Sequence, residues 1–281
     1  MTADLSWMLE DIVANVPKAR HAVLLSADGL PRGATEGMDP KDVRTISAAM
    51  AGMQSLSRAT SHFAGPGEDR EWNQTIIEFS HGWIFLIGAG QGAYLAAAAA
   101  PDVDMQQISF RMHRLVARLG NNLTSPPRVH AEDAGERPGQ PRADQQTGRG
   151  TGIPIADLDE VIGQVRGARH AVLLGADGLP RGATTGMSQD LADTISAAMT
   201  GIHAYSRATA QFAGPLKEAH WRQTVIEFQH GWIFLISAGH GAFLAAAAQH
   251  DADIEEFTTR LHQVVPHLSG NPAPRGEASR A

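Results

Sequence analysis

The amino-acid sequence contains the same long segment twice. Residues 21–98 and 170–247 align without a gap at a constant offset of 149 positions, and about two-thirds of the aligned positions are identical. The motif AVLLSADGLPRGAT returns as AVLLGADGLPRGAT, and HGWIFLI returns unchanged. A repeat of this length is a whole domain, because the units of solenoid proteins span only about 20–50 residues. The chain is therefore expected to hold two copies of one domain, which suggests a dimer made covalent.

The composition changes between the two copies. Residues 123–153 are rich in proline, glycine and polar residues and show no hydrophobic period, which is typical of a disordered linker. A linker of about 30 residues spans on the order of 30 Å, which is enough to let the two domains pair. We expect a first domain over residues 1–122, the linker over 123–153, a second domain over 154–271 and a flexible tail over 272–281.

Charge and composition exclude several classes of function. The 281 residues include 23 Lys and Arg against 30 Asp and Glu, so a basic face for nucleic acid is not expected. The absence of cysteine excludes thiol chemistry, disulfides and cysteine-ligated zinc. The sequence shows neither a signal peptide nor an apolar run of about 18 residues. We therefore expect a cytoplasmic protein without direct membrane insertion.

Hydrophobic spacing predicts the same eight elements in each copy, in the order α-β-β-α-β-β-β-α. In the first copy Asp39 and Pro40 begin a long helix of about 25 residues, and Gly65–Pro66 ends it. Pro31 places the second strand at an edge of the sheet. Short turns between consecutive strands imply an antiparallel sheet, and helices on its faces complete an α+β sandwich. Pro266 should kink the last helix of the second copy or end it early.

The remaining elements of the first copy follow from apolar spacing and turn residues. They are a helix near 5–16, strands at 21–26, 30–35, 74–79, 83–87 and 93–99, and a closing helix at 105–119. The second copy keeps the corresponding positions, and one face of its closing helix is apolar at the same six positions as in the first copy.

The long helix carries more apolar residues than one buried stripe needs. A helix of this kind is expected to contact two surfaces, its own sheet and the other domain. The candidate interface residues are Ile46, Met50, Met53, Ser57 and Arg58, with their counterparts Ile195, Met199, Ile202, Ser206 and Arg207.

The arginine of the S-R-A-T motif, Arg58 or Arg207, has several interpretations. It could be a solvated helix residue, a member of an ion pair within its domain, or a contact to a partner protein, since arginine is enriched at interface hot spots. A position in the middle of a helix disfavours a catalytic arginine supplied to a GTPase.

One segment has the appearance of an enzymatic motif. The first copy reads WIFLIGAGQGAYL, which is similar to a dinucleotide-binding turn. The second copy reads SAGHGAF at the turn and so loses the first glycine, and no βαβ unit surrounds either copy. We interpret the segment as a hairpin turn that leads into a strand of small residues, on which a helix can pack closely.

Titratable residues that recur in both copies offer no complete active site. A metal site needs three or four converging ligands, so the recurring histidines are expected at the surface or at strand ends; they are His21/His170, His81/His230 and His113/His262. Glu78 and Glu227 are expected on the solvent face of a strand, without a partner for acid–base chemistry. No nucleophile elbow, Walker A loop or paired-carboxylate motif occurs. We therefore expect no enzymatic activity and no cofactor or metal.

The element order, the A-V-L-L-S-A-D-G hairpin, the capped long helix and the W-x-Q-T-I-I-E-F strand resemble the Roadblock/LC7 family, including its LAMTOR-like members. The sequence is most similar to bacterial members encoded beside small Ras-like GTPases in actinobacterial operons. The resemblance implies two profilin-like sandwiches in tandem, each with a five-stranded antiparallel sheet. In this family the long helices of two domains pair and the sheets extend across the dimer. Members are not enzymes, and they bind small GTPases or scaffold larger complexes.

The resemblance implies a regulator or scaffold of a small Ras-like GTPase that acts through a pseudo-dimer of the two repeats, with a homodimer of the chain as a further possibility. Alternatives are a module that senses a small molecule and a purely structural oligomerisation module. The repeats differ most at 39–44 against 188–193, at 53–56 against 202–205 and at 67–71 against 216–220. Two similar cores are therefore expected to present two different surfaces.

Overall fold

A computed structural model describes residues 6–65, 71–90, 92–119, 155–215, 219–239 and 241–268. The expected linker at 123–153 and the tail at 272–281 lie outside these residues. Within the described part of the chain, no helix is long and apolar enough to cross a membrane.

The first repeat contains the predicted elements together with one additional short helix. In chain order they are α1 (Ser6–Asn15), β1 (Ala19–Ser26), β2 (Pro31–Ala34), α2 (Pro40–Ala59), α3 (Ser61–Ala64), β3 (Trp72–Phe79), β4 (Gly82–Gly88), β5 (Ala93–Ala99) and α4 (Met105–Leu119).

The second repeat has the same order of elements. They are α5 (Ile155–Gln164), β6 (Ala168–Gly175), β7 (Pro180–Ala183), α6 (Gln189–Ala208), α7 (Ala210–Ala213), β8 (Trp221–Phe228), β9 (Gly231–Gly239), β10 (Ala242–Gln249) and α8 (Ile254–Leu268). The α+β class and the order α-β-β-α-β-β-β-α are thereby confirmed.

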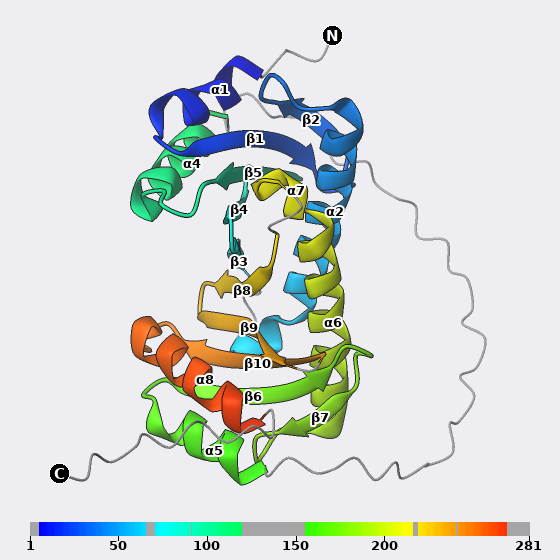
Figure 1. The fold of residues 1–281 in the computed structure, drawn as a ribbon, viewed down its shortest axis with the longest axis vertical. Coiled ribbons are helices and arrows are strands. Elements are labelled where there is room, and N and C mark those ends of the chain that lie inside the picture. The colour runs from blue at the N-terminus through cyan, green and yellow to red at the C-terminus, as the bar shows by residue number, and fades with distance from the viewer. Residues whose placement is uncertain are drawn as a thin grey trace, which may run out of the picture.

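The two five-stranded sheets join into a single antiparallel sheet of ten strands. Its order is β2-β1-β5-β4-β3-β8-β9-β10-β6-β7, so β3 and β8 pair at the centre (Figure 1). Ile76 lies opposite Val225 in this central pair, and Gln74 lies opposite Glu227. The sequence placed the second strand of each repeat at an edge, and β2 and β7 are the two edges. Since each begins with a proline, which donates no ladder hydrogen bond, the edge position suits them.

Helices cover the two faces of the sheet in different ways. The long helices α2 and α6 lie side by side on one face, which we call the inner face (Figure 1). On the opposite, outer face, α1 and α4 cover the strands of the first repeat, and α5 and α8 cover those of the second. The central strands β3 and β8 lie between α4 and α8 on this outer face.

This arrangement produces one shared core and two separate ones. The core beneath α2 and α6 contains buried residues of both repeats, for example Met50 and Met199. The core beneath α1 and α4 contains residues of the first repeat alone, and that beneath α5 and α8 contains residues of the second. The inner core therefore depends on both repeats being present, since separation would expose it to water.

Two expectations about the helices need correction. The long helix does not run unbroken to Gly65: α2 ends at Ala59, and α3 begins at Ser61. Thr60 makes the break, because its hydroxyl donates to the Ser57 carbonyl at 2.7 Å and competes with the helical pattern. The helix α8 is not ended early by Pro266 but continues to Leu268. This proline lies in the last turn, where few hydrogen bonds remain to be lost.

The alanine strand β5 has the role that the sequence suggested. It pairs with β4 and β1 and is buried along its whole length. Ala96 and Ala98 face the shared core, whereas Ala97 and Ala99 face the core beneath α1 and α4. Because β4 and β5 are antiparallel, the glycine-rich segment between them is a hairpin turn and not a dinucleotide-binding turn.

The ends of the long helices cross to the opposite repeat. The short helix α3 contacts β9 and β10 of the second repeat, and α7 contacts β4 and β5 of the first. Gly82, at the start of β4, lies so close to α7 that an added Cβ would be 2.9 Å from the Ala213 carbonyl oxygen. It would also collide with the carbonyl oxygen of Ala99 in its own repeat.

We predict that Gly82→Ala lowers the free energy of unfolding by about 1–3 kcal/mol, the usual cost of overpacking. Backbone atoms of both repeats meet the new methyl group, so neither can move aside alone. Gly88→Ala at the other end of β4 is the matched control, since a Cβ there meets nothing within 4 Å. Urea unfolding measures both variants. Equal midpoints of urea unfolding for Gly82→Ala and Gly88→Ala would contradict the close approach of α7 to Gly82.

Candidate functional site

The inner face holds all ten residues that the sequence proposed for an interface. Eight of them are buried in or beside the shared core, with at most 1% of each side chain exposed; they are Ile46, Met50, Met53, Ser57, Ile195, Met199, Ile202 and Ser206. Arg58 and Arg207 are exposed on the same two helices. The fold thus brings the eight buried residues together and leaves the two arginines at the surface. That any of the ten residues contacts a partner protein stays a prediction.

The two buried serines satisfy their hydroxyl groups within the protein. Ser57 donates to the Met53 carbonyl at 2.9 Å, and Ser206 bonds to the Ile202 carbonyl at 2.9 Å. Ser206 also lies 3.1 Å from the hydroxyl of Thr224 on β8. Buried hydroxyls need such partners, because an unpaired one costs about 1–3 kcal/mol.

The long helices cross at a pair of glycines. A Cβ added at Gly52 would lie 2.6 Å from the ring of Tyr205, and one added at Gly201 would lie 2.6 Å from Leu56. Leu56 and Tyr205 occupy the same position in the two repeats. Each large side chain therefore rests on the glycine of the opposite helix, and the two crossings differ in shape and polarity.

The sequence places the recurring histidines at the surface or at strand ends, but it does not predict that two of the three pairs contact the opposite repeat. His21 stacks on Phe212 at 6.3 Å between ring centroids, and His170 stacks on Phe63 at 6.4 Å. In each pair the two rings come from different repeats. Burial lowers the pKa of His21 and of His170, and the neighbouring arginines Arg20 and Arg169 lower both pKa values further. These histidines are therefore neutral, packed groups at the junction of the repeats.

A second pair of histidines contacts the ends of the crossing helices. His81 is 7% exposed, and its Nε2 lies 3.4 Å from the Ala210 carbonyl oxygen. His230 makes the matching contact to the Ser61 carbonyl at 3.3 Å. Arg20 donates to the carbonyl oxygens of His81 and Ala213, so it links the two repeats as well.

One feature of the sequence does indicate these contacts, namely that the side chains that make them are identical in the two copies. His21, His81 and Phe63 each recur unchanged in the second copy, and so does Arg20, which returns as Arg169. Rings and charges kept in both copies fit a junction that each repeat makes with the other. The third pair differs, because His113 and His262 are exposed on α4 and α8.

Glu78 and Glu227 also differ from expectation. They lie on the outer face, yet their side chains are only 14% and 16% exposed, and each bonds to the other repeat. Gln223 donates to Glu78 at 2.7 Å, and Gln74 donates to Glu227. Arg222 adds an ion pair to Glu78 at 3.0 Å. The lone strand carboxylate predicted from each copy thus has a partner, which the opposite repeat supplies.

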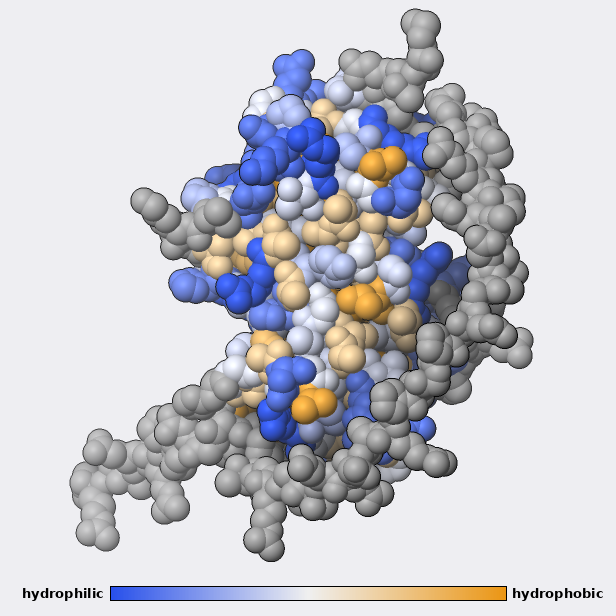
Figure 2. All heavy atoms as spheres, turned by 90° about the vertical axis from the view of Figure 1, so that its right-hand side faces the viewer, coloured by the Kyte–Doolittle hydropathy of each residue, from blue (hydrophilic) through white to orange (hydrophobic). Residues whose placement is uncertain are grey.

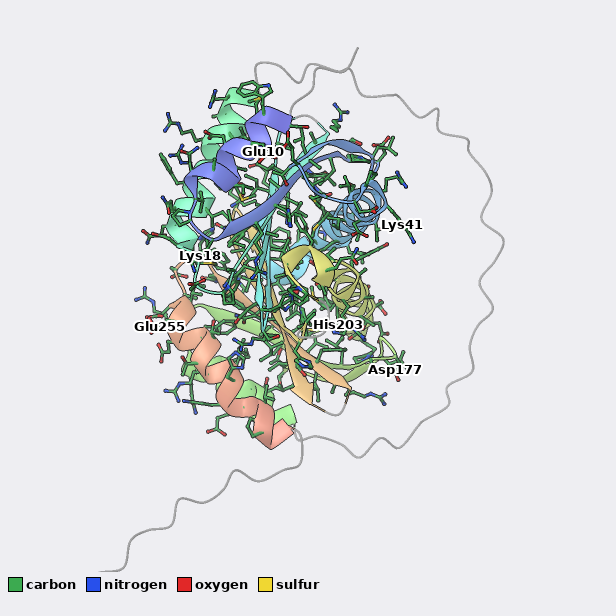
Figure 3. All side chains as sticks on the ribbon, turned by 45° about the horizontal axis from the view of Figure 1, so that its top comes forward. Glu10, Lys18, Lys41, Asp177, His203 and Glu255 are labelled. Carbon is green, nitrogen blue, oxygen red and sulfur yellow. The ribbon has the colours of Figure 1, made fainter. Side chains whose placement is uncertain are left out.

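The inner face is asymmetric where the repeats diverged. His203 of α6 packs between Trp221 and Phe243, with ring centroids 4.6 Å and 4.3 Å away. It lies in the interior in Figure 3, whereas Lys41 and Asp177 lie at the periphery. The corresponding residue of α2 is Gln54, which is buried. The same pocket of the fold therefore holds an ionisable ring in one repeat and a neutral amide in the other.

Burial lowers the pKa of His203 from its ordinary value of 6.5 to about 4, and the positive charge of Arg207 contributes to a smaller degree. The charged imidazolium would lose water without gaining an anionic partner. His203 is accordingly neutral at pH 7.

The outward surface of α2 and α6 is the exposed part of the inner face. Figure 2 views this side, whose middle is covered mostly by residues of intermediate hydropathy, with hydrophilic residues toward its margins. Small residues such as Ser55 and Ala204 are exposed there, together with Arg58 and Arg207. Among the described residues neither arginine forms an ion pair, so the ion-pair interpretation of the S-R-A-T motif finds no support there.

The described part of the inner face shows no clustered metal ligands. Within the described ranges, no group of three or more His, Asp or Glu side chains is arranged to hold a metal ion. The histidines at the junction are packed against rings and carbonyl groups. What the geometry presents is one continuous surface that both repeats build together.

Comparisons with known proteins agree with the repeated architecture. The family model of the Roadblock/LC7 domain matches residues 5–99 and again 154–248. A Roadblock/LC7 domain from Streptomyces avermitilis is 32% identical, with a TM-score of 0.41, over 44% of this chain and 100% of that one. No match is found among curated proteins.

Two further solved structures share lower identity. The gliding protein MglB from Thermus thermophilus is 21% identical, with a TM-score of 0.37, over 43% of this chain and 90% of that one. MglC from Myxococcus xanthus is 16% identical, with a TM-score of 0.29, over 41% of this chain and 95% of that one.

We predict that the protein loses stability in acid partly through His203. Its folded pKa of about 4 lies below its ordinary value of 6.5, so the unfolded chain binds the proton first as the pH falls. The stabilising contribution is complete above pH 6.5 and disappears as the pH approaches 4. We expect a loss of about 1–2 kcal/mol, less than the full shift would give, because the ring is partly exposed.

The variant His203→Gln isolates this effect, since it installs the residue that the first repeat carries at the same place. Urea unfolding between pH 7 and pH 4 should show a weaker pH dependence for the variant than for the natural chain. His21 and His170 also have lowered pKa values, but both are present in the natural chain and in the variant, so their contributions cancel in the comparison. Parallel pH profiles would show that His203 is not a source of acid sensitivity.

Proposed function

The chain belongs to the Roadblock/LC7 family in both repeats, and on this premise we propose that it is a cytoplasmic, non-enzymatic regulator or scaffold of a small Ras-like GTPase. It acts by protein–protein binding through the pseudo-dimer that its repeats form. The single observation that carries the proposal is the composite outward surface of α2 and α6, which exposes an arginine from each repeat.

This surface has features that favour a protein partner. Arg58 and Arg207 are exposed without an ion-pair partner among the described residues, so a partner carboxylate or phosphate can bind them without first breaking a contact. Tyr205 of α6, whose ring lies over Gly52 of α2, is 37% exposed. Arginine and tyrosine are enriched among interface hot spots, because they combine a large contact area with directed hydrogen bonds. The small residues around them allow a partner backbone to approach closely.

The partner surface depends on pairing of the repeats. Each helix contributes half of it, and the helices are held by the shared core and by the β3–β8 ladder. A covalent link gives the second domain an effective concentration in the millimolar range for a flexible linker. The surface is therefore present at any protein concentration, which a dimer of separate single domains does not guarantee.

Regulation then follows from differential binding. A protein that binds one conformation of the GTPase switch segments more tightly shifts the equilibrium toward that conformation by the difference in binding free energy. The arginines act as contacts in this mechanism and do not enter the reaction. The asymmetry of the face, with Leu56 on one side and Tyr205 on the other, favours one partner in one orientation.

The test is a pull-down with the Ras-like GTPase encoded nearest to the gene of this chain, loaded with GDP or with a GTP analogue. We expect retention that depends on the nucleotide. Arg58→Ala and Arg207→Ala should each weaken binding by about 1–2 kcal/mol, or roughly tenfold, if they are hot spots.

Arg114→Ala is the matched control, since Arg114 is exposed on α4 and away from the inner face. It should leave retention unchanged. Equal retention of the natural chain and both inner-face variants would rule out the inner face as the binding surface. A complete failure to retain the GTPase in either nucleotide state would count against the regulatory role itself.

A further inference from the structure

Two adjacent cavities open on the outer face of the first repeat, between α4 and the central strands. The larger, of about 530 Å³, lies between Ile76, Phe85, Met105 and Phe110. The smaller, of about 400 Å³, lies beside Asn73 and Glu227. Gln74 and His113 line both cavities, so the two lie side by side. We call them together the α4 groove.

One end of the α4 groove is apolar. Phe110 of α4 is 64% exposed, although it is a large aromatic residue. Ile76 of β3 and Met105 of α4 are partly buried beside it. An exposed aromatic ring over a cavity with aliphatic walls is a place where a large apolar side chain of a partner loses contact with water.

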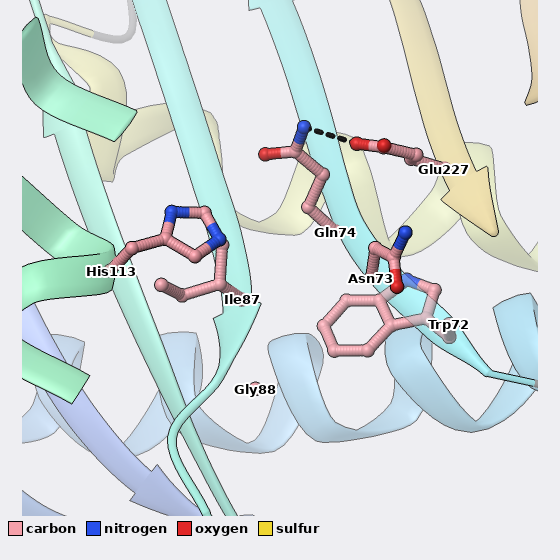
Figure 4. Close-up of a pocket in the computed structure, with 7 residues that line it drawn as sticks. All are labelled: Trp72, Asn73, Gln74, Ile87, Gly88, His113 and Glu227. Carbon is pink, nitrogen blue, oxygen red and sulfur yellow. Dashed lines mark hydrogen bonds between the residues drawn. The ribbon is translucent and has the colours of Figure 1, made fainter. Parts of the chain in front are cut away.

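The other end of the α4 groove carries one acidic group. Glu227 reaches it from β8, and Gln74 donates a hydrogen bond to its carboxylate (Figure 4). The Nε2 atom of His250 lies 3.8 Å from the same carboxylate, on the side of the second repeat. In the described structure no arginine or lysine pairs with Glu227. A half-buried carboxylate with free acceptor positions favours a cation at this end.

The second repeat has a matching cavity of about 410 Å³ whose chemistry differs. Arg222 stands where the first repeat has Asn73, and it pairs with Glu78 at 3.0 Å. Thr259 stands where the first repeat has Phe110. In this matching cavity Arg222 of the second repeat already pairs with Glu78 of the first, and no aromatic ring stands at the position of Phe110. The two ends of the outer face are therefore unequal binding surfaces.

We propose that the α4 groove binds a segment of a partner protein that carries an arginine or lysine side chain close to a large apolar side chain. The cation pairs with Glu227 in the place that Arg222 occupies in the second repeat. The apolar side chain packs between Phe110, Ile76 and Met105. This surface is separate from α2 and α6, and the inference does not rest on a GTPase partner.

Charge complementarity identifies the partner segment as basic. The chain has a net charge of −7, which attracts basic segments over a long range. Apart from Glu227, the residues that line the two cavities carry no aspartate, glutamate, arginine or lysine. An anionic segment would meet Glu227 with no lining arginine or lysine to offset it. Of the two matching positions on the outer face, the α4 groove is the one that combines a carboxylate without an arginine partner, Glu227 of the second repeat, with an exposed aromatic ring, Phe110 of the first.

The experiment is a selection from a displayed random peptide library on the immobilised full chain, followed by affinity measurements on the enriched peptides. We expect enriched sequences that share an arginine or lysine within about one helical turn, or two to four residues, of a large apolar residue. Their affinity should fall at least tenfold for Glu227→Gln, for Phe110→Thr and for Asn73→Arg. The last two variants copy the residues of the second repeat, so the fold already accommodates them.

The controls are the equivalent changes around the matching cavity, at Glu78 of β3 and Thr259 of α8. Glu78→Gln and Thr259→Ala should leave peptide affinity within about twofold of the natural chain, and thermal unfolding of each variant shows that it is folded. Enriched peptides without a basic residue, equal loss of binding for the α4-groove variants and the control variants, or a selection that enriches nothing would each overturn the proposal. A GTPase pull-down through the inner face can succeed or fail independently of all these outcomes.

Discussion

The antiparallel pairing of β3 with β8 is the constraint on which the rest of the structure depends. It turns two five-stranded sheets into one sheet of ten strands and sets α2 beside α6 on its inner face. The apolar side chains of those helices then bury a core that belongs to both repeats. Neither half completes this core alone, so separation of the two repeats would expose its apolar side chains to water.

The repeats have diverged unevenly around this shared centre. Some contacts that cross between them are kept in both copies, as His21 with Phe212 and His170 with Phe63 show. Other positions differ between the copies. Asn73 against Arg222 and Phe110 against Thr259 make the ends of the outer face unequal, and Leu56 against Tyr205 does the same for the inner face. The covalent link between the copies makes such asymmetry possible, because within one chain the first repeat always pairs with the second and never with another first repeat.

Much of the fold follows from the sequence, because local patterns decide it. The spacing of apolar residues, Asp39 as a helix cap and Pro31 as an edge residue depend on neighbours in the chain, and each appears as expected. The break at Thr60 cannot be predicted from the sequence, because a threonine that ends a helix by bonding to the preceding turn looks the same in the sequence as a threonine inside a helix. Pro266 disturbs α8 less than the sequence suggests, because the effect of a proline on a helix depends on its distance from the helix end.

The candidate site was less predictable, because it depends on which repeat a side chain faces. The residues next to His21 in the sequence do not indicate that its ring stacks on Phe212. Those next to Glu78 do not indicate that it accepts a hydrogen bond from Gln223 across the central strands. Each copy, taken alone, shows a lone histidine and a lone carboxylate. Only the alignment of the copies, which keeps these residues in both, carries that information. The wide apolar character of the long helix did indicate a second contact surface.

The most direct test of the central account is the mass of the chain by size-exclusion chromatography with light scattering, measured over a wide range of concentrations. Pairing within one chain predicts a constant mass of 29.9 kDa. A mass that doubles or keeps rising with concentration would show that the repeats pair between chains, and would contradict the closed pseudo-dimer.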